Sequence, residues 1–237
     1  MLNAYLTQFN ALIQAPNSPI QLISTTQATT YINTARGQVA TEGECIRNYA
    51  TLALAAATQQ YPFSLIALAA GTIGVAGVIN VRMAGYQIAA GQRRIVQREW
   101  EWFNRYVLQN PAPVPGPPRY MAQFGQGANG TLWFNLPDIS YVVALDAVCL
   151  PSALAVDSDP EAIPYQWTDA VPFYAAWLGM MNEQRQGDAE AMMKRYQELM
   201  RRARGAATPS VTPHQYAQGP DLTLANQLGL QQRGGGG

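Results

Sequence analysis

A long apolar run without charges is the feature that most constrains how this chain can fold. No acidic or basic residue occurs between Arg47 and Arg82, and residues 61–81 (YPFSLIALAAGTIGVAGVINV) are almost wholly apolar. A helix of about 20 apolar residues is long enough to span a bilayer. The run nevertheless repeats glycine beside β-branched residues and has Pro62 near its start, which weakens a helix and favours strands. We therefore predict short, buried strands with tight turns, and no membrane segment.

Charged residues are scarce in the rest of the chain as well. They make up 13% of the 237 residues, whereas about 25% is usual for a soluble protein. A polar but weakly charged exterior suits a subunit whose sides are covered by neighbours. Residues 1–14 have no basic start and no long apolar centre, so we expect no secretion signal and synthesis in the cytoplasm.

The charges that are present are segregated along the chain. Residues 121–184 contain seven acids and no base, whereas the other segments carry 15 bases and eight acids. Such complementary segments can meet within one fold or between adjacent subunits, and they give no strong nucleic-acid or membrane footprint. The seven acids are Asp138, Asp146, Asp157, Asp159, Glu161, Asp169 and Glu183.

Helical periodicity occurs at both ends of the chain. Apolar residues recur on one helical face in residues 2–14 and again in residues 25–41. The period returns over residues 162–183, where Pro172 lies inside the pattern and should kink the helix. A last helix begins near Gly187. These segments predict helices at both ends of the chain.

Between these helices the pattern changes to short runs bounded by Gly, Pro and Asn. Regularly spaced runs of this kind indicate a small antiparallel sheet or sandwich. Within it, REWEWFNRYVLQ indicates one helix near residues 94–109, which a proline-rich loop ends. The strand candidates are NYATLALAAA (48–57), GVINVRMAGYQI (77–88), RYMAQF (119–124), TLWFNL (131–136) and SYVVALDAVCL (140–150).

The predicted fold class is α+β, with helices at both ends of the chain, an antiparallel β-rich region between them and an extended C-terminal arm. Residues 1–45 and 157–205 would form the helical part, and residues 46–156 the β-rich part. Residues 206–237 lose periodicity and are rich in Pro, Gln and Gly, so alone they should be extended or disordered. An arm of this kind often becomes ordered on a partner.

Two short motifs suggest ligand chemistry that their context does not support. GQGANG (125–130) spells G-x-G-x-x-G, but dinucleotide binding needs a helix directly after the glycines, and the TLWFNLP that follows is typical of a strand. DSDPE (157–161) gathers acids as a calcium loop does, yet the Gly and Glu of an EF-hand are missing. We interpret these acids as the start of a helix, where the dipole favours them, and expect no cofactor or metal.

Arginines alternate with aromatic residues over residues 98–106, a pattern that also occurs where proteins clamp single-stranded nucleic acid. More often such aromatics belong to a core and such arginines to a solvated face. We adopt this second interpretation.

The residues form no catalytic constellation. The one histidine, His214, lies in the predicted arm, where a general base would not be held against a nucleophile. Cys45 and Cys149 have no CxxC spacing and no neighbouring histidine, so two buried, reduced thiols are the expectation, with a disulfide left open. Paired carboxylates stay possible, because sequence spacing does not measure separation in the fold. An enzyme is thus only the second hypothesis.

Three blocks of the sequence resemble the head-to-tail connector, or adaptor, proteins of short-tailed bacteriophages. They are INTARGQVATEGECIRN (32–48), residues 98–138, and YQWTDAVPFYAAWLGMM (165–181) with DAEAMMKRYQELMRRAR (188–204). The third block is the most informative, because adaptor-like proteins resemble one another in two late helices and in a W-x-D-A-V-P-x-x-A-A sequence. Together the blocks cover most of residues 25–205.

The resemblance implies a helical bundle with an inserted antiparallel β-rich domain. It also implies a virion structural protein of the neck or tail, and no enzyme. It implies a homo-oligomeric ring, usually of twelve copies, that lies under the portal protein, receives the tail nozzle protein and extends the DNA channel. DNA would pass through without sequence-specific binding, and no membrane is involved. The alternatives are a tail nozzle or other tail structural protein and, further off, a cell-wall hydrolase.

The resemblance also implies that the C-terminal arm docks on the portal or on a neighbouring subunit. The basic end of the last helix complements the negative pole of its dipole and could meet an acidic neighbour. The residues predicted for this docking are Arg201, Arg202, Arg204, Pro209, Pro213, His214 and Tyr216.

Overall fold

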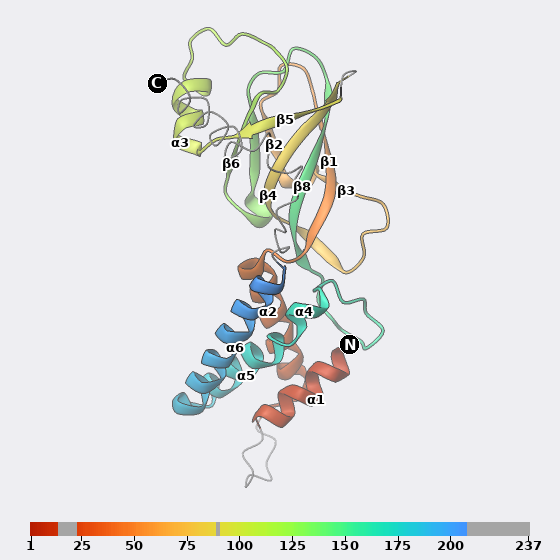
Figure 1. The fold of residues 1–237 in the computed structure, drawn as a ribbon, viewed down its shortest axis with the longest axis vertical. Coiled ribbons are helices and arrows are strands. Elements are labelled where there is room, and N and C mark those ends of the chain that lie inside the picture. The colour runs from red at the N-terminus through yellow and green to blue at the C-terminus, as the bar shows by residue number, and fades with distance from the viewer. Residues whose placement is uncertain (14–22, 89–90, 208–237) are drawn as a thin grey trace, which may run out of the picture.

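The computed structural model describes residues 1–13, 23–88 and 91–207. The chain forms two lobes, one above the other (Figure 1). We call residues 1–46 and 152–207 the helical lobe and residues 47–151 the sheet lobe. The predicted α+β class, with helices from both ends of the chain and a β-rich insertion between them, is confirmed. The predicted arm (206–237) lies almost wholly outside the described residues, and its conformation stays a prediction.

The helical lobe packs N-terminal helices against C-terminal helices. Ser24 caps the second helix, accepting a hydrogen bond from the Gln27 N–H, while the Gln27 side chain accepts from the Ser24 N–H. Glu44 ends that helix with a left-handed backbone (φ 45°). The elements are α1 (Leu2–Ile13), α2 (Thr25–Gly43), α4 (Tyr165–Thr168), α5 (Val171–Asn182) and α6 (Gln186–Ala207).

The expected kink at Pro172 is instead a break between two helices. The short α4 ends at Thr168, and α5 begins at Val171 with Pro172 in its first turn. Proline is tolerated there because the first N–H groups of a helix have no intrahelical acceptor. The proline therefore starts a helix rather than bending one.

Small residues let the helices of the lobe approach closely. Ala35, Ala175 and Ala176 are fully buried between α2 and α5. A Cβ on Gly43 of α2 would lie 2.7 Å from the buried Trp167 ring, so the indole packs directly on the helix backbone. Close packing of this kind is sensitive to single methyl groups.

The sheet lobe is one eight-stranded curled sheet in the order β2-β7-β6-β5-β4-β8-β1-β3. Six strand pairs are antiparallel as predicted, but β5 and β6 are parallel, pairing Val96 with Tyr120. The helical segment 100–108 and the proline-rich loop form the crossover that a parallel pair requires. The strands are β1 (Arg47–Leu54), β2 (Gln60–Pro62), β3 (Ala67–Leu68), β4 (Val75–Ile88), β5 (Gly91–Gln97), β6 (Tyr120–Phe124), β7 (Thr131–Phe134) and β8 (Tyr141–Pro151).

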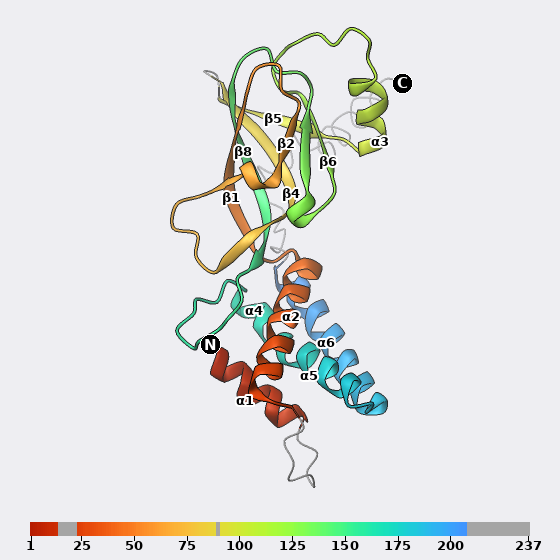
Figure 2. The same ribbon diagram turned by 180° about the vertical axis from the view of Figure 1, so that it is seen from behind.

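The sheet is strongly curled (Figure 2), and its two short edge strands, β2 and β3, follow one another closely in sequence. Only the 3-10 turn η1 (Phe63–Leu65) and Ile66 separate them. The buried Tyr61 hydroxyl holds β2 against the turn that follows β1. It accepts a hydrogen bond from the Ala55 N–H (2.8 Å) and lies 3.0 Å from the Thr58 carbonyl oxygen. Leu52, Phe134 and Leu145 belong to the core that the sheet encloses.

The prediction of buried strands throughout residues 61–81 is wrong for its middle. Leu65 and Ile73 are 58% and 68% exposed, and residues 69–74 form a surface loop between β3 and β4. Gly71 and Gly74 have positive φ (88° and 70°), which glycine adopts readily and which turns the chain away from the sheet. No helix within the described residues is long and apolar enough to cross a membrane.

The helix expected near residues 94–109 begins later than predicted. Residues 94–97 lie in β5, where Arg94 pairs with Gly85 and Ile95 with Ala84 of β4. The helical segment is α3 (Trp100–Phe103), continued by the π-helical turn η2 (Asn104–Leu108). Pairing on both sides of β5 overrides the helical pattern of its last residues.

Candidate assembly surfaces

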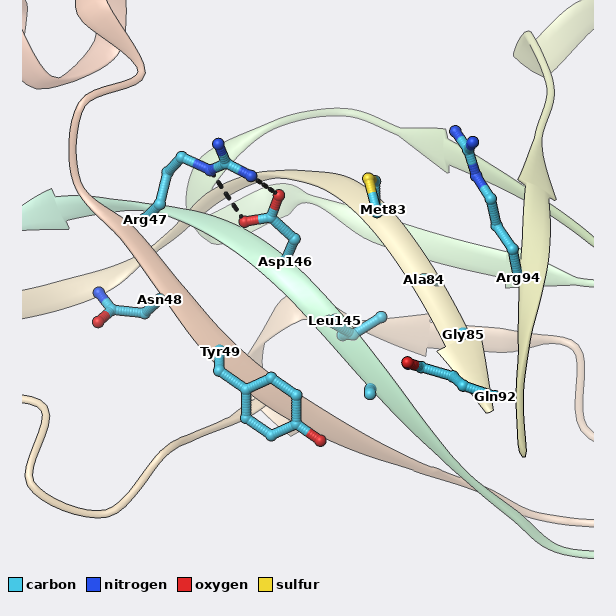
Figure 3. A pocket seen from close by; sticks show the side chains of 11 residues that line it. Arg47, Asn48, Tyr49, Met83, Ala84, Gly85, Gln92, Arg94, Leu145 and Asp146 are labelled. Carbon is cyan, nitrogen blue, oxygen red and sulfur yellow. Dashed lines mark hydrogen bonds and ion pairs between the residues drawn. The ribbon is translucent and has the colours of Figure 1, made fainter. Parts of the chain in front are cut away.

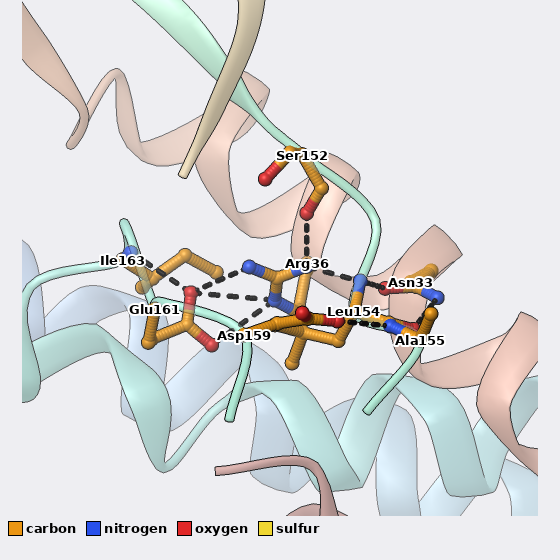
Figure 4. A network of polar contacts seen from close by, with 8 residues as sticks. All are labelled: Asn33, Arg36, Ser152, Leu154, Ala155, Asp159, Glu161 and Ile163. Carbon is orange, nitrogen blue, oxygen red and sulfur yellow. Dashed lines mark hydrogen bonds and ion pairs between the residues drawn. The ribbon is translucent and has the colours of Figure 1, made fainter. Parts of the chain in front are cut away.

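A buried polar network of the helical lobe lies where the chain leaves the sheet lobe, and we call it the waist network (Figure 4). Arg36 of α2 has no exposed surface, and its guanidinium binds both oxygens of Glu161, with Nη2 to Oε1 at 2.7 Å and Nε to Oε2 at 3.0 Å. Nη1 also donates to the Ser152 carbonyl at 2.6 Å. Because Ser152 directly follows β8, the network ties the helical lobe to the end of the sheet.

Asn33, one turn before Arg36, extends the waist network. Its side-chain NH2 donates to the Leu154 carbonyl (3.0 Å), and its side-chain oxygen accepts from the Leu154 N–H (2.8 Å). Both backbone groups of Leu154, in the linker after β8, are therefore hydrogen-bonded to α2. Sequence analysis missed this role of Asn33 and Arg36. The available signal was a lone arginine among the inward residues of the second helix.

The acids of residues 157–161 have partners within the chain. Asp157 accepts from the N-terminal amine (2.7 Å) and the Asn3 N–H (2.9 Å), and these bonds hold the pKa of Asp157 below its ordinary value. Backbone N–H groups of residues 155 and 156 likewise lower the pKa of Asp159. The acids therefore brace the loop before α4 rather than a helix start, which corrects that interpretation. Within the described ranges, no group of three or more His, Cys, Asp or Glu is placed to hold a metal.

The predicted docking arginines lie on the exposed end of α6. Arg202 binds Glu198 one turn earlier, and Arg204 donates to the Glu42 carbonyl oxygen (2.9 Å), which ties α6 to α2. Arg201 is exposed. Docking through these residues stays a proposal. The other four predicted docking residues, Pro209, Pro213, His214 and Tyr216, lie outside the described residues.

The outer face of the sheet carries a hollow of about 620 Å³ over β1, β8, β4 and β5 (Figure 3). Tyr49, Asp146 and Met83 are register partners across three strands, and Arg47 binds Asp146 with its Nε at 3.1 Å from Oδ1. Tyr49 and Met83 are 60% and 48% exposed. Arg94 lies at the opposite rim. Asp146 lies between the two apolar side chains, so the hollow combines exposed apolar and charged groups, as many protein interfaces do.

The remaining sequence motifs have structural positions. Residues 125–130 form a 3-10 turn, η3 (Gly127–Asn129), followed by β7, so the predicted strand after the glycines is confirmed. Cys45 and Cys149 are both free thiols, and Cys45 is only half-buried where a buried thiol was expected. Burial raises the pKa of the Cys45 thiol to about 12 and also raises that of Cys149.

Comparison with solved structures gives a likeness, whereas comparison with sequence families gives none. No family model and no curated protein matches the chain. The chain is similar to one in a solved structure described as "Neck of empty GTA particle computed with C6 symmetry", at 15% identity and a TM-score of 0.24. The likeness covers 72% of this chain and 74% of that one. At this TM-score it carries no argument about function.

Proposed function

We propose that this chain is a structural protein of a bacteriophage particle, a head-to-tail adaptor that forms a ring of about twelve copies between portal and tail. The number of copies comes from the sequence resemblance alone. The observation that carries the proposal is the two-lobed fold, in which helices from both ends of the chain hold a β-rich insertion, as the resemblance implies. The particle neck or tail would be its location, after synthesis in the host cytoplasm.

The exposed surface supports a role in assembly. Apolar side chains lie uncovered on the sheet lobe, where Tyr49 of β1, Met83 of β4 and Val142 of β8 are 60%, 48% and 65% exposed. Such a face would be covered when copies associate. The waist network would keep the two lobes in one orientation, which every copy of a closed ring must share.

The test is native mass spectrometry of the purified chain, alone and mixed with the cognate portal ring. The adaptor proposal predicts about one added copy per portal subunit. A chain that does not bind the portal but binds a purified tail assembly would instead be a tail protein, such as a nozzle. Clearing of cell-wall substrate by the chain would contradict the structural role altogether.

Two variants would locate the docking surface. Deletion of residues 206–237 should leave both lobes folded and abolish attachment to the portal. Charge reversal at Arg201, Arg202 and Arg204 should weaken ring or portal assembly. Full attachment by the truncated chain would exclude residues 206–237 as the docking segment. Unchanged assembly by the charge-reversed variant would exclude an electrostatic contribution of the three arginines to docking.

A further inference from the structure

A second basic surface lies on the sheet lobe, away from the hollow. Arg98 and Arg105 lie over the rings of Trp102, Tyr106 and Tyr120, and Arg119 lines a hollow together with two of these rings. We call these six residues the arginine platform. They come from α3, η2, β6 and the residues just before α3 and β6.

Aromatic rings support two of the three guanidinium groups. The Arg98 guanidinium carbon lies 4.8 Å from the Trp102 ring centre and 5.8 Å from that of Tyr120, and the Arg105 carbon lies 5.5 Å from the Tyr106 ring centre. The Trp102 ring centre is in turn 5.3 Å from Tyr106 and 5.4 Å from Tyr120. Contacts of this kind hold a guanidinium in place while its N–H edge stays able to donate.

No carboxylate in the described part of the chain forms an ion pair with Arg98, Arg105 or Arg119. Glu99 and Glu101 are nearby in sequence, but both are exposed and neither pairs with the platform. The whole sheet lobe carries seven arginines and four acids, whereas the helical lobe carries seven bases and ten acids. The platform therefore belongs to the basic part of a chain with no net charge.

A hollow of about 330 Å³ adjoins the platform. Tyr106, Arg119 and Tyr120 line one side of it, and the proline-rich loop lines another. Polar groups are also present, since Asn110 and Asn135 contribute to the lining. The Asn135 side-chain oxygen accepts from the Arg119 N–H at 2.7 Å, which fixes the backbone that carries this arginine.

We propose that the arginine platform binds the phosphodiester backbone of double-stranded DNA without reading its sequence. A guanidinium edge matches a phosphate in geometry and charge, and several such contacts give binding that is independent of sequence. Guanidinium groups already lie on the Trp102, Tyr106 and Tyr120 rings, which disfavours the base stacking that single-strand binding needs. This inference deepens the proposed function, since it names the surface that would contact DNA in the channel, but the binding itself can be measured on the isolated chain.

The experiment is fluorescence anisotropy of a labelled 20-base-pair duplex titrated with the full chain at about 50 mM salt, where phosphate contacts are strong. The test variant is Arg98→Gln, Arg105→Gln and Arg119→Gln together. The matched control is Arg82→Gln, Lys194→Gln and Arg195→Gln, which removes the same charge at exposed positions outside the platform and the docking surface. We expect the platform variant to lose at least tenfold in affinity and the control to change less than twofold.

The salt dependence gives a second readout. Loss of three phosphate contacts should reduce the slope of log K against log salt by about 3. A variant with lysine at the three platform positions keeps the charge but loses the planar contact, so its affinity should fall between the other two. Near-ultraviolet circular dichroism would show that the variants keep their tertiary packing.

Several outcomes would overturn the inference. They are no duplex binding by the unaltered chain, equal losses in the platform and control variants, or tighter binding to a single strand than to the duplex. A platform variant that changes only the oligomeric mass would show that the arginines meet another copy instead. DNA binding without portal attachment would leave this inference standing and refute the adaptor, so the two failures are distinguishable.

Discussion

The two lobes use their arginines differently. In the helical lobe Arg36, Arg185, Arg195, Arg202 and Arg204 each meet a carboxylate of the same lobe. In the sheet lobe Arg47 and Arg82 are paired, whereas no ion pair within the described residues involves Arg93, Arg94, Arg98, Arg105 or Arg119. The difference indicates that charge in the helical lobe serves the fold, while charge far from the waist in the sheet lobe is available to a partner.

The largest expected effect is at the waist network. Arg36→Met leaves the Glu161 carboxylate buried without its cation, which should lower the free energy of unfolding by about 3–5 kcal/mol. Urea denaturation measures this loss. The double variant Arg36→Met with Glu161→Gln removes the uncompensated charge and should recover part of it. A loss below about 1 kcal/mol in the single variant would mean that the network does not hold the lobes together.

Substitutions at two glycines of α2 test the close packing of the helical lobe independently of its polar contacts. Gly43→Ala places a methyl group 2.7 Å from the Trp167 ring and should destabilise the protein by about 1–3 kcal/mol. Gly37→Ala is the matched control, because nothing lies within 4 Å of its Cβ. Thermal unfolding should show that this control is more stable by about 0.5–1 kcal/mol, through helix propensity alone. Equal behaviour of the two variants would contradict the close approach of the indole.

A smaller effect is expected where an arginine of the sheet lobe is paired on the surface. Arg47→Gln breaks the exposed contact with Asp146 and should cost at most about 1 kcal/mol of stability. Arg94→Gln, across the same hollow, removes no described ion pair and should leave the urea midpoint unchanged. If Arg94→Gln destabilised the protein more than Arg47→Gln, the distinction between arginines with and without an ion pair in the sheet lobe would fail.

The smallest effect concerns the loop before α4. The pKa of Asp157 is lowered in the fold, so its contribution to stability is present above the ordinary pKa of 3.8 and is lost as pH falls through the lower folded value. Melting temperatures measured from pH 6 down to pH 2 should therefore fall below about pH 4. Asp157→Asn should make this fall shallower, and an identical slope would show that the aspartate contributes nothing.

The helices could be predicted because their signals are local. The face of α1 and the cap at Ser24 can be read within a few turns. The last residues of β5 could not, because residues 94–97 join a sheet through partners that are far away in sequence on one side. The parallel pairing of β5 and β6 has no local signature for the same reason.

The surfaces were less predictable than the elements. Arg36 is a lone arginine among the inward residues of α2, but its partner Glu161, 125 residues away, became visible only in the fold. The apolar residues of the sheet hollow are brought together by the register of three strands. The mixture of arginine and aromatic residues before Tyr106 was visible in the sequence, but the absence of carboxylate partners became visible only in the fold.

The short edges of the curled sheet bear on aggregation. β3 has two residues, and β2 has three, of which Pro62 offers no N–H. Edges of this length give an incoming strand few backbone groups to extend, so runaway polymerisation through added strands is disfavoured. At high concentration such chains would therefore resist forming fibrils through their edges, even though each chain carries a long apolar sequence.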